Sequence, residues 1–190
     1  MFLLRDDINE IGAMIKAGKI ICYPTDTVWA LGCDATNSAA VQAIRSIKNI
    51  PDTEGLVVLV NSIDMLKSLV EEIPPRIETL LALHHRPFTL VYTLKGGLSQ
   101  NVCAEDGTVA IRFTNDEFCA TLIDIAGGPI VATIAAMHGA PHPANFGGVS
   151  SSILGSADYV VKHRQDDKRT NEPSPLARLD QFQELEFIRE

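Results

Sequence analysis

The stretch YPTDTVWALGCD, residues 23–34, is the most informative segment of the chain. It begins at the end of a short apolar run, Lys19–Tyr23, which has the length and composition of a buried strand. Pro24 stops that strand because proline cannot donate to a sheet. Residues 25–27 (Thr-Asp-Thr) then place two hydroxyls and a carboxylate just beyond it. Because ligands of open α/β sheets bind at the carboxyl ends of strands, the stretch predicts an α/β fold with a ligand site after its first strand.

Outward from this stretch, helical and strand patterns alternate almost to the end of the chain. Helices are expected over residues 8–17, 38–48, 63–74, 76–83, 116–126 and 149–154. The expected capping side chains are Asp7, Asn37 or Ser38, Ser62, and Asn115. Further strands are expected over residues 56–60, 89–94, 108–113, 129–134, 159–161 and 185–188. This alternation predicts one domain, residues 1–190, built on one twisted, mixed, partly parallel sheet with flanking helices.

Composition excludes several classes of protein. The 190 residues are 46% hydrophobic and carry a net charge of -8, which argues against indiscriminate binding of nucleic acid. The apolar opening, Met1–Leu4, is cut off by Arg5 and is too short for a signal peptide. No apolar run has the length of a membrane span, so a cytoplasmic protein without membrane contact is expected. Its four cysteines are scattered and are expected to be reduced, buried thiols rather than disulfides or a zinc site.

Three further polar residues lie near the ends of predicted elements. Arg112 ends the strand 108–113, Thr133 follows the apolar pair 130–131, and Lys48 ends the second helix. The two cations, Lys48 and Arg112, together with the hydroxyls of the threonines, would suit a small polar anion.

Most of these residues also have a purely structural interpretation. Thr25 and Asp26 are common turn residues, Thr133 is a β-former, and the helix dipole alone favours Lys48 at its position. Arg112 is the exception, because a guanidinium after three apolar residues is costly to bury without a partner.

Read together, several segments resemble one known family. The matching segments are residues 23–34 against Y-P-T-D-T-V-Y-G-L-G-C-D with Ala30 in place of a glycine, RPFTLV (86–91) against G-P-L-T-L-V, VAIR (109–112) against V-A-V-R, PIVAT (129–133) against P-L-V-S-T, and PHPANF (141–146) against P-x-P-A-N-F. They occur in order over almost the whole chain and are similar to the YrdC/YciO family.

The resemblance implies a twisted α/β sheet with a concave pocket and synthesis of threonylcarbamoyl-AMP. The substrates would be L-threonine, bicarbonate and ATP with Mg²⁺, and pyrophosphate would be released. A transferase system would then pass the threonylcarbamoyl group to tRNA. Matched positions imply that Thr25, Thr27 and Arg112 line the threonine pocket. They also imply that Lys48, Thr89, Thr133 and Ser174 face the nucleotide.

Three departures fall in the implied ATP site. Ile50 stands where the family has the arginine of K-x-R, Ile134–Ala136 replaces S-x-N, and Arg86 replaces a glycine. Each lost donor to a charged group costs about 1.5–3 kcal/mol. Arg45, three residues before Lys48, and Arg86 are candidates to compensate, unless both are solvated surface residues.

Alternatives from other classes remain open. A degenerate paralogue would bind a nucleotide or structured RNA without chemistry, and a double-stranded RNA binder would need basic residues clustered on the concave face. His138 and His142 have helical metal-ligand spacing, but Gly139 and Pro141 forbid a regular helix. The pair at 84–85 (His-His) lacks a third ligand, so no metal site is expected.

Overall fold

The computed structural model describes residues 6–83 and 86–190, so the expectations for residues 1–5 and for the histidine pair 84–85 lie outside the described part. Within it, the α-helices are α1 (Ile8–Lys16), α2 (Ser38–Lys48), α3 (Ile63–Leu69), α4 (Pro75–Leu83), α5 (Glu117–Ala126) and α6 (Ser151–Ser156). Short 3₁₀ turns are η1 (Gln100–Val102) and η2 (Phe146–Gly148). The strands are β1 (Ile21–Tyr23), β2 (Ala30–Gly32), β3 (Val57–Val60), β4 (Thr89–Thr93), β5 (Thr108–Phe113), β6 (Ile130–Val131), β7 (Thr133–Ile134), β8 (Tyr159–Val160), β9 (Leu176–Leu179) and β10 (Leu185–Arg189).

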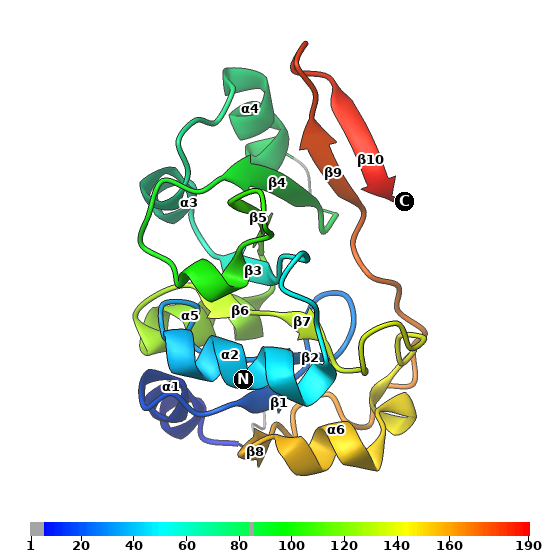
Figure 1. The fold of residues 1–190 in the computed structure, drawn as a ribbon. Helices are drawn as coiled ribbons and strands as arrows, with labels where there is room; N and C mark the ends of the chain where they lie inside the picture. Colours follow the sequence, from blue (N-terminus) through cyan, green and yellow to red (C-terminus); the bar gives the residue numbers. More distant parts are fainter. Residues whose placement is uncertain (1–5, 84–85) are drawn as a thin grey trace.

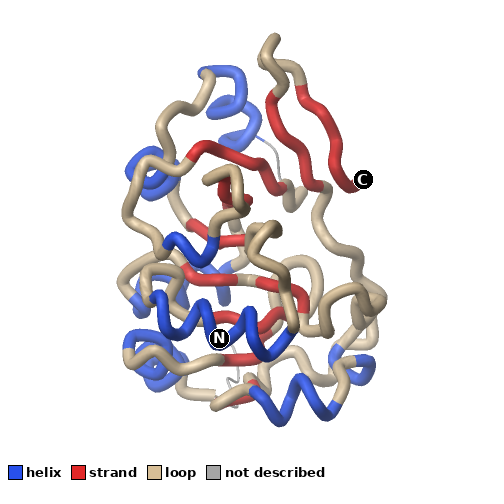
Figure 2. Tube along the Cα trace, in the orientation of Figure 1, coloured by secondary structure: helices blue, strands red, loops and turns tan. Residues whose placement is uncertain are grey.

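The strands form two mixed sheets instead of the single sheet expected, while the mixed, partly parallel α/β class is confirmed (Figure 1). The smaller sheet has the order β7-β2-β1-β8, and the larger has the order β10-β9-β4-β5-β3-β6. Pairs β1–β8, β3–β5 and β4–β9 are parallel, and the others are antiparallel. Helices and strands of the two sheets are stacked along the long axis of the molecule (Figure 2).

The sheets meet at residues 130–134, which the sequence pattern predicted as one strand. Ile130 and Val131 pair with β3 of the larger sheet, whereas Thr133 and Ile134 pair with β2 of the smaller sheet. Ala132 lies at the change of partner, and its N–H donates to the carbonyl of Val57. One continuous run of β-formers therefore serves two sheets, which periodicity alone does not reveal.

Most helix starts follow the expected capping chemistry. The carboxylate of Asp7 accepts from the N–H groups of Asn9 and Glu10, and the side chain of Asn37 caps α2. The predicted cap of α5 is one residue off, because Asp116, not Asn115, accepts from the N–H of Cys119. A side-chain oxygen caps the N–H two or three positions onward, and Asp116 has that spacing.

In the middle of the chain one helix is shorter than expected, and near the end the sequence analysis missed a strand. Helix α3 ends at Leu69 instead of near residue 74, because Val70 is extended and forms a bridge with Leu94. Strand β9 was not expected; it adds the β9–β10 hairpin to the edge of β4. The segment between β8 and β9 runs along one side of the molecule from the smaller sheet to the larger (orange in Figure 1).

Two clusters of buried apolar side chains hold these layers together. The larger includes Ile44, Val58 and Leu90, and the smaller packs α1 and α5 on β1 through Ile11 and Leu122. Each fully buried side chain of this size contributes roughly 1.5–3 kcal/mol. The four cysteines are free and buried, and none of the described helices is both long enough and apolar enough to span a membrane.

The close contact of Gly32 in β2 with Val131 in β6, next to the change of partner at Ala132, yields a test of the fold. A Cβ at Gly32 would lie 2.1 Å from the carbonyl oxygen of Val131 and 2.6 Å from Cε1 of Tyr23. Since neither the sheet backbone nor the buried ring can move freely, Gly32→Ala should lower the free energy of unfolding by about 1–3 kcal/mol or more. Chemical denaturation measures this change.

Gly155 in α6 provides the matched control, because a Cβ there would meet nothing within 4 Å. Gly155→Ala should be neutral or stabilising by about 0.5–1 kcal/mol. Equal stability of the two variants would contradict the close packing of β2.

Candidate functional site

A cavity of about 390 Å³ lies where the two sheets meet, a volume within the range of small-molecule sites. The structure brings together at this cavity six residues that the sequence pointed to: Thr25, Thr27, Lys48, Arg112, Thr133 and Ser174. Thr89 is fully buried beside it, with its hydroxyl 2.7 Å from that of Ser174. These residues come from both sheets, from α2 and from the segment before β9.

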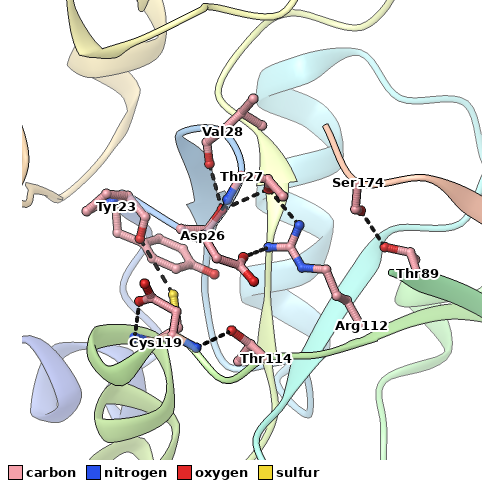
Figure 3. A network of polar contacts seen from close by, with 12 residues as sticks. Tyr23, Asp26, Thr27, Val28, Thr89, Arg112, Thr114, Cys119 and Ser174 are labelled. Atoms are coloured by element: carbon pink, nitrogen blue, oxygen red, sulfur yellow. Dashed lines mark hydrogen bonds and ion pairs between the residues drawn. The ribbon is translucent and has the colours of Figure 1, made fainter. Parts of the chain in front are cut away.

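A chain of hydroxyls connects Arg112 to the loop after β1 (Figure 3). Arg112 Nη1 donates to Thr27 Oγ1 at 2.6 Å, and the hydroxyls of Thr27 and Thr25 are 3.0 Å apart. Thr25 Oγ1 donates to the carbonyl of Val28 at 2.8 Å. Because a hydroxyl has one proton, the bond between the two threonines must be donated by Thr27. Donor directions therefore run from Arg112 through Thr27 and Thr25 to the backbone.

Asp26 gives Arg112 its counter-charge, and the sequence reading did not include this pair. Arg112 Nη2 and Asp26 Oδ1 lie 3.0 Å apart, and the Arg112 side chain is only 5% exposed. The contact is an ion pair without hydrogen-bond alignment, since Asp26 Oδ1 and Arg112 Nε are both buried without a hydrogen-bond partner. Burial raises the pKa of Asp26, although Arg112 opposes the shift. Among the described residues the Nε–H group has no acceptor, and the atom is buried rather than exposed to the cavity.

Lys48 is the cation on the α2 side of the cavity. Its ammonium donates to the hydroxyl of Thr133 and, at 2.6 Å, to the carbonyl of Ile134. No carboxylate pairs with it among the described ion pairs. Burial lowers the pKa of Lys48 from its ordinary 10.5 to about 8. A buried ammonium with only neutral partners is suited to binding an anion.

Arg189 is a third cation at the cavity, and the sequence reading missed it. Its Nε and Nη2 atoms donate to the carbonyl of Ser174 at 3.1 and 2.7 Å. Burial lowers the pKa of Arg189, and the positive charge of Arg112 lowers it further. In the sequence, Arg189 is recognisable just as a cation at the end of the last strand. Its contact with Ser174 depends on the pairing of β10 with β9, which the sequence analysis did not predict.

Three residues that depart from the family pattern, Ile50, Ile134 and Ala136, line this cavity with apolar groups. Glu54 also lines it and carries a negative charge. Glu54 Oε1 lies 3.5 Å from His138 Nε2, and His142 Nε2 lies 2.9 Å from Glu172 Oε2. The lining of the cavity therefore combines cationic side chains with apolar and acidic ones.

The two arginines proposed as compensation have different positions. Arg45 is buried and donates to the backbone carbonyls of Asn101, Pro51, Glu54 and Cys103. It does not line the cavity, so it ties loops together instead of compensating for a lost phosphate donor. Arg86 is exposed and lines a second cavity, which shares Thr27, Pro173 and Ser174 with the first.

Within residues 6–83 and 86–190, no group of three or more His, Cys, Asp or Glu side chains is placed to hold a metal ion. His138 and His142 line the cavity and are each paired with a glutamate.

Fold and site together define an α/β protein with a cation-lined cavity at the junction of two mixed sheets. A family model described as "Telomere recombination", which represents Sua5, YciO and YrdC proteins, matches residues 13–190. The chain belongs to the Sua5/YciO/YrdC family.

Comparisons with individual proteins agree with this membership. The chain is 30% identical over 158 residues to a threonylcarbamoyl-AMP synthase of Xanthomonas euvesicatoria, which covers 82% of this chain and 84% of the relative. It is 37% identical over 119 residues to the enzyme of the same name from Saccharophagus degradans, covering 62% of each.

Solved structures show the same fold. Sua5 of P. abyssi, solved in complex with L-threonine, has a TM-score of 0.79 and 27% identity over 90% of this chain. This chain spans only about half of that Sua5 chain, 50%. E. coli YciO has a TM-score of 0.82 over 96% of this chain and 88% of its own, with 18% identity.

The depressed pKa of Lys48 yields a stability prediction. The pKa of Lys48 in the folded protein is about 8, below its value in the unfolded chain. Below pH 8 the lysine is charged in both the folded and the unfolded state, and there its burial destabilises the folded state by the full amount. Lys48→Met should therefore raise the free energy of unfolding at pH 7. The expected gain is about 1–2 kcal/mol, because loss of the donor to Thr133 and Ile134 offsets part of it.

This gain should be complete below pH 8 and fade toward pH 10.5, where the lysine is neutral in both states. Urea denaturation of both proteins at pH 7 and pH 10 measures it. A Lys48→Met variant with a lower free energy of unfolding than the wild type at pH 7 would show that the buried charge does not destabilise the folded state.

Proposed function

We propose that this protein makes threonylcarbamoyl-AMP from L-threonine, bicarbonate and ATP, the first step of threonylcarbamoyladenosine formation in tRNA, in the cytoplasm. The observation that carries the proposal is the convergence of Lys48, Arg112 and Arg189 on one cavity with the hydroxyls of Thr25 and Thr27. Membership of the family and the names of the curated relatives support the same reaction.

The end of the cavity at Arg112 suits an amino acid. Arg112, which lines this end of the cavity, would donate to the carboxylate of L-threonine in a charge-assisted hydrogen bond. Asp26, through its ion pair, and Thr27, through its hydroxyl, hold the guanidinium in a fixed orientation. Sua5 of P. abyssi, which was crystallised with L-threonine, has the same fold and supports this assignment.

The proposed reaction has two balanced steps. The amino group of L-threonine adds to bicarbonate and water leaves, which gives a carbamate. A carbamate oxygen then forms a bond to the α-phosphorus of ATP, and the bond to pyrophosphate breaks. Lys48 and Arg189 would bind the phosphate oxygens and spread the charge that develops, while the cavity walls hold the two substrates in line.

Mg²⁺ would enter as part of the substrate MgATP. Magnesium usually takes one or two carboxylates together with substrate phosphates and keeps several waters. Among the described residues that line the cavity, Glu54 is the one that carries a carboxylate. One carboxylate suits a magnesium ion that arrives with the nucleotide better than an ion held by the protein alone.

A second candidate function is a non-catalytic paralogue that binds the nucleotide or tRNA without chemistry. The specific observation in its favour is that Ile50, Ile134 and Ala136 line the cavity where the family pattern has polar side chains. These groups can pack against a nucleotide but cannot donate to its phosphates.

Pyrophosphate release from ATP separates the two candidates. Release that requires both L-threonine and bicarbonate is expected for the synthase. Binding of ATP without such release, measured on the same preparation, would instead establish the non-catalytic candidate.

Thr27→Val tests the role of the hydroxyl chain. Valine has the same shape but cannot accept from Arg112, so activity at subsaturating L-threonine should fall about 10–100-fold. Thr121→Val on α5 is the matched control, because the Thr121 hydroxyl donates to the carbonyl of Glu117 in its own helix; this variant should keep activity within about twofold. Unchanged activity of a folded Thr27→Val protein would remove Thr27 from the proposed site.

A further inference from the structure

Besides Arg112, a second arginine holds the loop of residues 24–28, which follows β1. Arg164 comes from the segment after β8, and its Nη1 donates to the carbonyl of Thr25 at 3.4 Å. Its Nη2 lies 2.7 Å from Asp116 Oδ2, and the Asp116 side chain is only 9% exposed. Arg112 reaches the same loop from β5. The loop is therefore held by arginines from two distant parts of the chain.

A third cavity, of about 270 Å³, lies between this loop and the segment after β8. The loop forms a wall that this cavity shares with the first one, through Thr25, Thr27 and Val28. The charged residues that line it are all in ion pairs: Asp26 with Arg112, Asp116 with Arg164, and Asp167 with Arg169. Because these charges compensate one another, they are suited to holding the loop in place more than to binding an ion.

The backbone of Arg164 is itself constrained. Its φ of 62° lies in the left-handed region, which is uncommon for a residue other than glycine. The two residues before it are tied down, because the carboxylate of Asp6 accepts from the N–H groups of Lys162 and His163 at 2.8–3.0 Å. A sparsely populated conformation persists where its surroundings over-determine it, and such residues cluster at functional sites. The anchored backbone thus directs the Arg164 side chain to the loop.

Asp26 experiences the charges of both arginines and of Asp116. Burial raises the pKa of Asp26, Arg112 lowers it, Asp116 raises it and Arg164 lowers it. An ionised carboxylate at this position neutralises the buried guanidinium of Arg112. Arg164 and Asp116 therefore act in opposite directions on the group that holds Arg112.

Other titratable groups also face Asp26. Tyr23 and Cys119 are buried, and burial raises the pKa of both, so they are neutral at pH 7. Four charged residues line the second or the third cavity together with Asp26: Arg86, Glu172, Asp167 and Arg169. Substitution of Arg164 or Asp116 leaves all of these groups in place, so a changed titration of Asp26 reports the substituted charge.

We infer that Arg164 and Asp116 are positioning residues of the amino-acid end of the site. They hold the loop of residues 24–28 from the side of the third cavity, so that the loop keeps the guanidinium of Arg112 directed at the carboxylate of L-threonine. Neither of them lines the first cavity, so both act through the loop. The inference rests on the proposed function, since L-threonine is the ligand whose position the loop would set.

Two substitutions that preserve the local backbone test the inference. Asparagine tolerates the left-handed conformation of residue 164, and it caps a helix as well as the aspartate at 116 does. Arg164→Asn and Asp116→Asn should therefore fold. Each should raise the Kd for L-threonine in calorimetric titration about three- to tenfold, because a charged contact that holds the loop is lost. The kcat for pyrophosphate release at saturating L-threonine should stay within about twofold of the wild type.

The two variants should move the titration of Asp26 in opposite directions. Loss of the Arg164 charge disfavours the ionised carboxylate, so the pKa of Asp26 should rise and the acid limb of kcat/KM for L-threonine should move to higher pH. Loss of the Asp116 charge should move both to lower pH. Nuclear magnetic resonance of isotope-labelled aspartate carboxyls measures the titration, with Asp26→Asn to assign the signal. A purely structural role would move both variants alike or not at all.

Arg169→Asn is the matched control on the same segment. Arg169 also lines the third cavity and pairs with an aspartate, Asp167, at 2.6 Å, but its side chain is 79% exposed. This variant should keep the Kd for L-threonine within about twofold and leave the titration of Asp26 unchanged. Arg164→Lys keeps the positive charge and should therefore keep the wild-type titration of Asp26.

The inference and the proposed function fail in different ways. Suppose that the wild type makes threonylcarbamoyl-AMP, and that Arg164→Asn and Asp116→Asn either keep its Kd for L-threonine or shift the titration of Asp26 in the same direction. The inference is then wrong and the proposed function stands. If the wild type neither binds L-threonine nor releases pyrophosphate, both are wrong. An equal loss of affinity in Arg169→Asn would point to a general charge effect and would also overturn the inference.

Discussion

The buried guanidinium of Arg112 is the constraint on which the rest of the site depends. Arg112 belongs to β5 of the larger sheet, whereas its partners Asp26 and Thr27 lie in the loop after β1 of the smaller sheet. A charge that is 95% removed from solvent must find partners, and here the partners are in the other sheet. The pair therefore fixes the loop against β5, and the cavity is the space left between them.

The charge of the whole chain and the charge of the cavity have opposite signs. The protein carries a net charge of -8, yet Lys48, Arg112 and Arg189 line the same cavity. Among the ion pairs of the described residues, Arg112 is the one of these three cations with a carboxylate partner. Local fields in clefts depend on such arrangements, not on the net charge, so an acidic protein can still select an anionic ligand.

The chemical residues of the site could be predicted because they follow strand ends, where the chain leaves a sheet. Thr25, Thr27, Arg112 and Thr133 were found by this rule, Lys48 by its place at the end of a helix, and Ser174 by resemblance. Arg189 could not be found, because its place at the cavity depends on pairing β10 with β9 and β9 with β4. Arg45 was predicted as a phosphate donor because it shares a helix face with Lys48. Its guanidinium instead donates to loop carbonyls, some of them from distant parts of the sequence, and the sequence did not reveal this. The switch of partner at Ala132 was hidden for the same reason, since apolar β-formers pair equally well in either sheet.

A crystal structure of the full chain grown with L-threonine would test most directly whether this junction is an amino-acid site. The account predicts the carboxylate of the ligand within hydrogen-bond distance of Arg112, with the Asp26 and Thr27 contacts retained. Clear density for L-threonine elsewhere on the protein, with the space beside Arg112 filled by side chains, would contradict it.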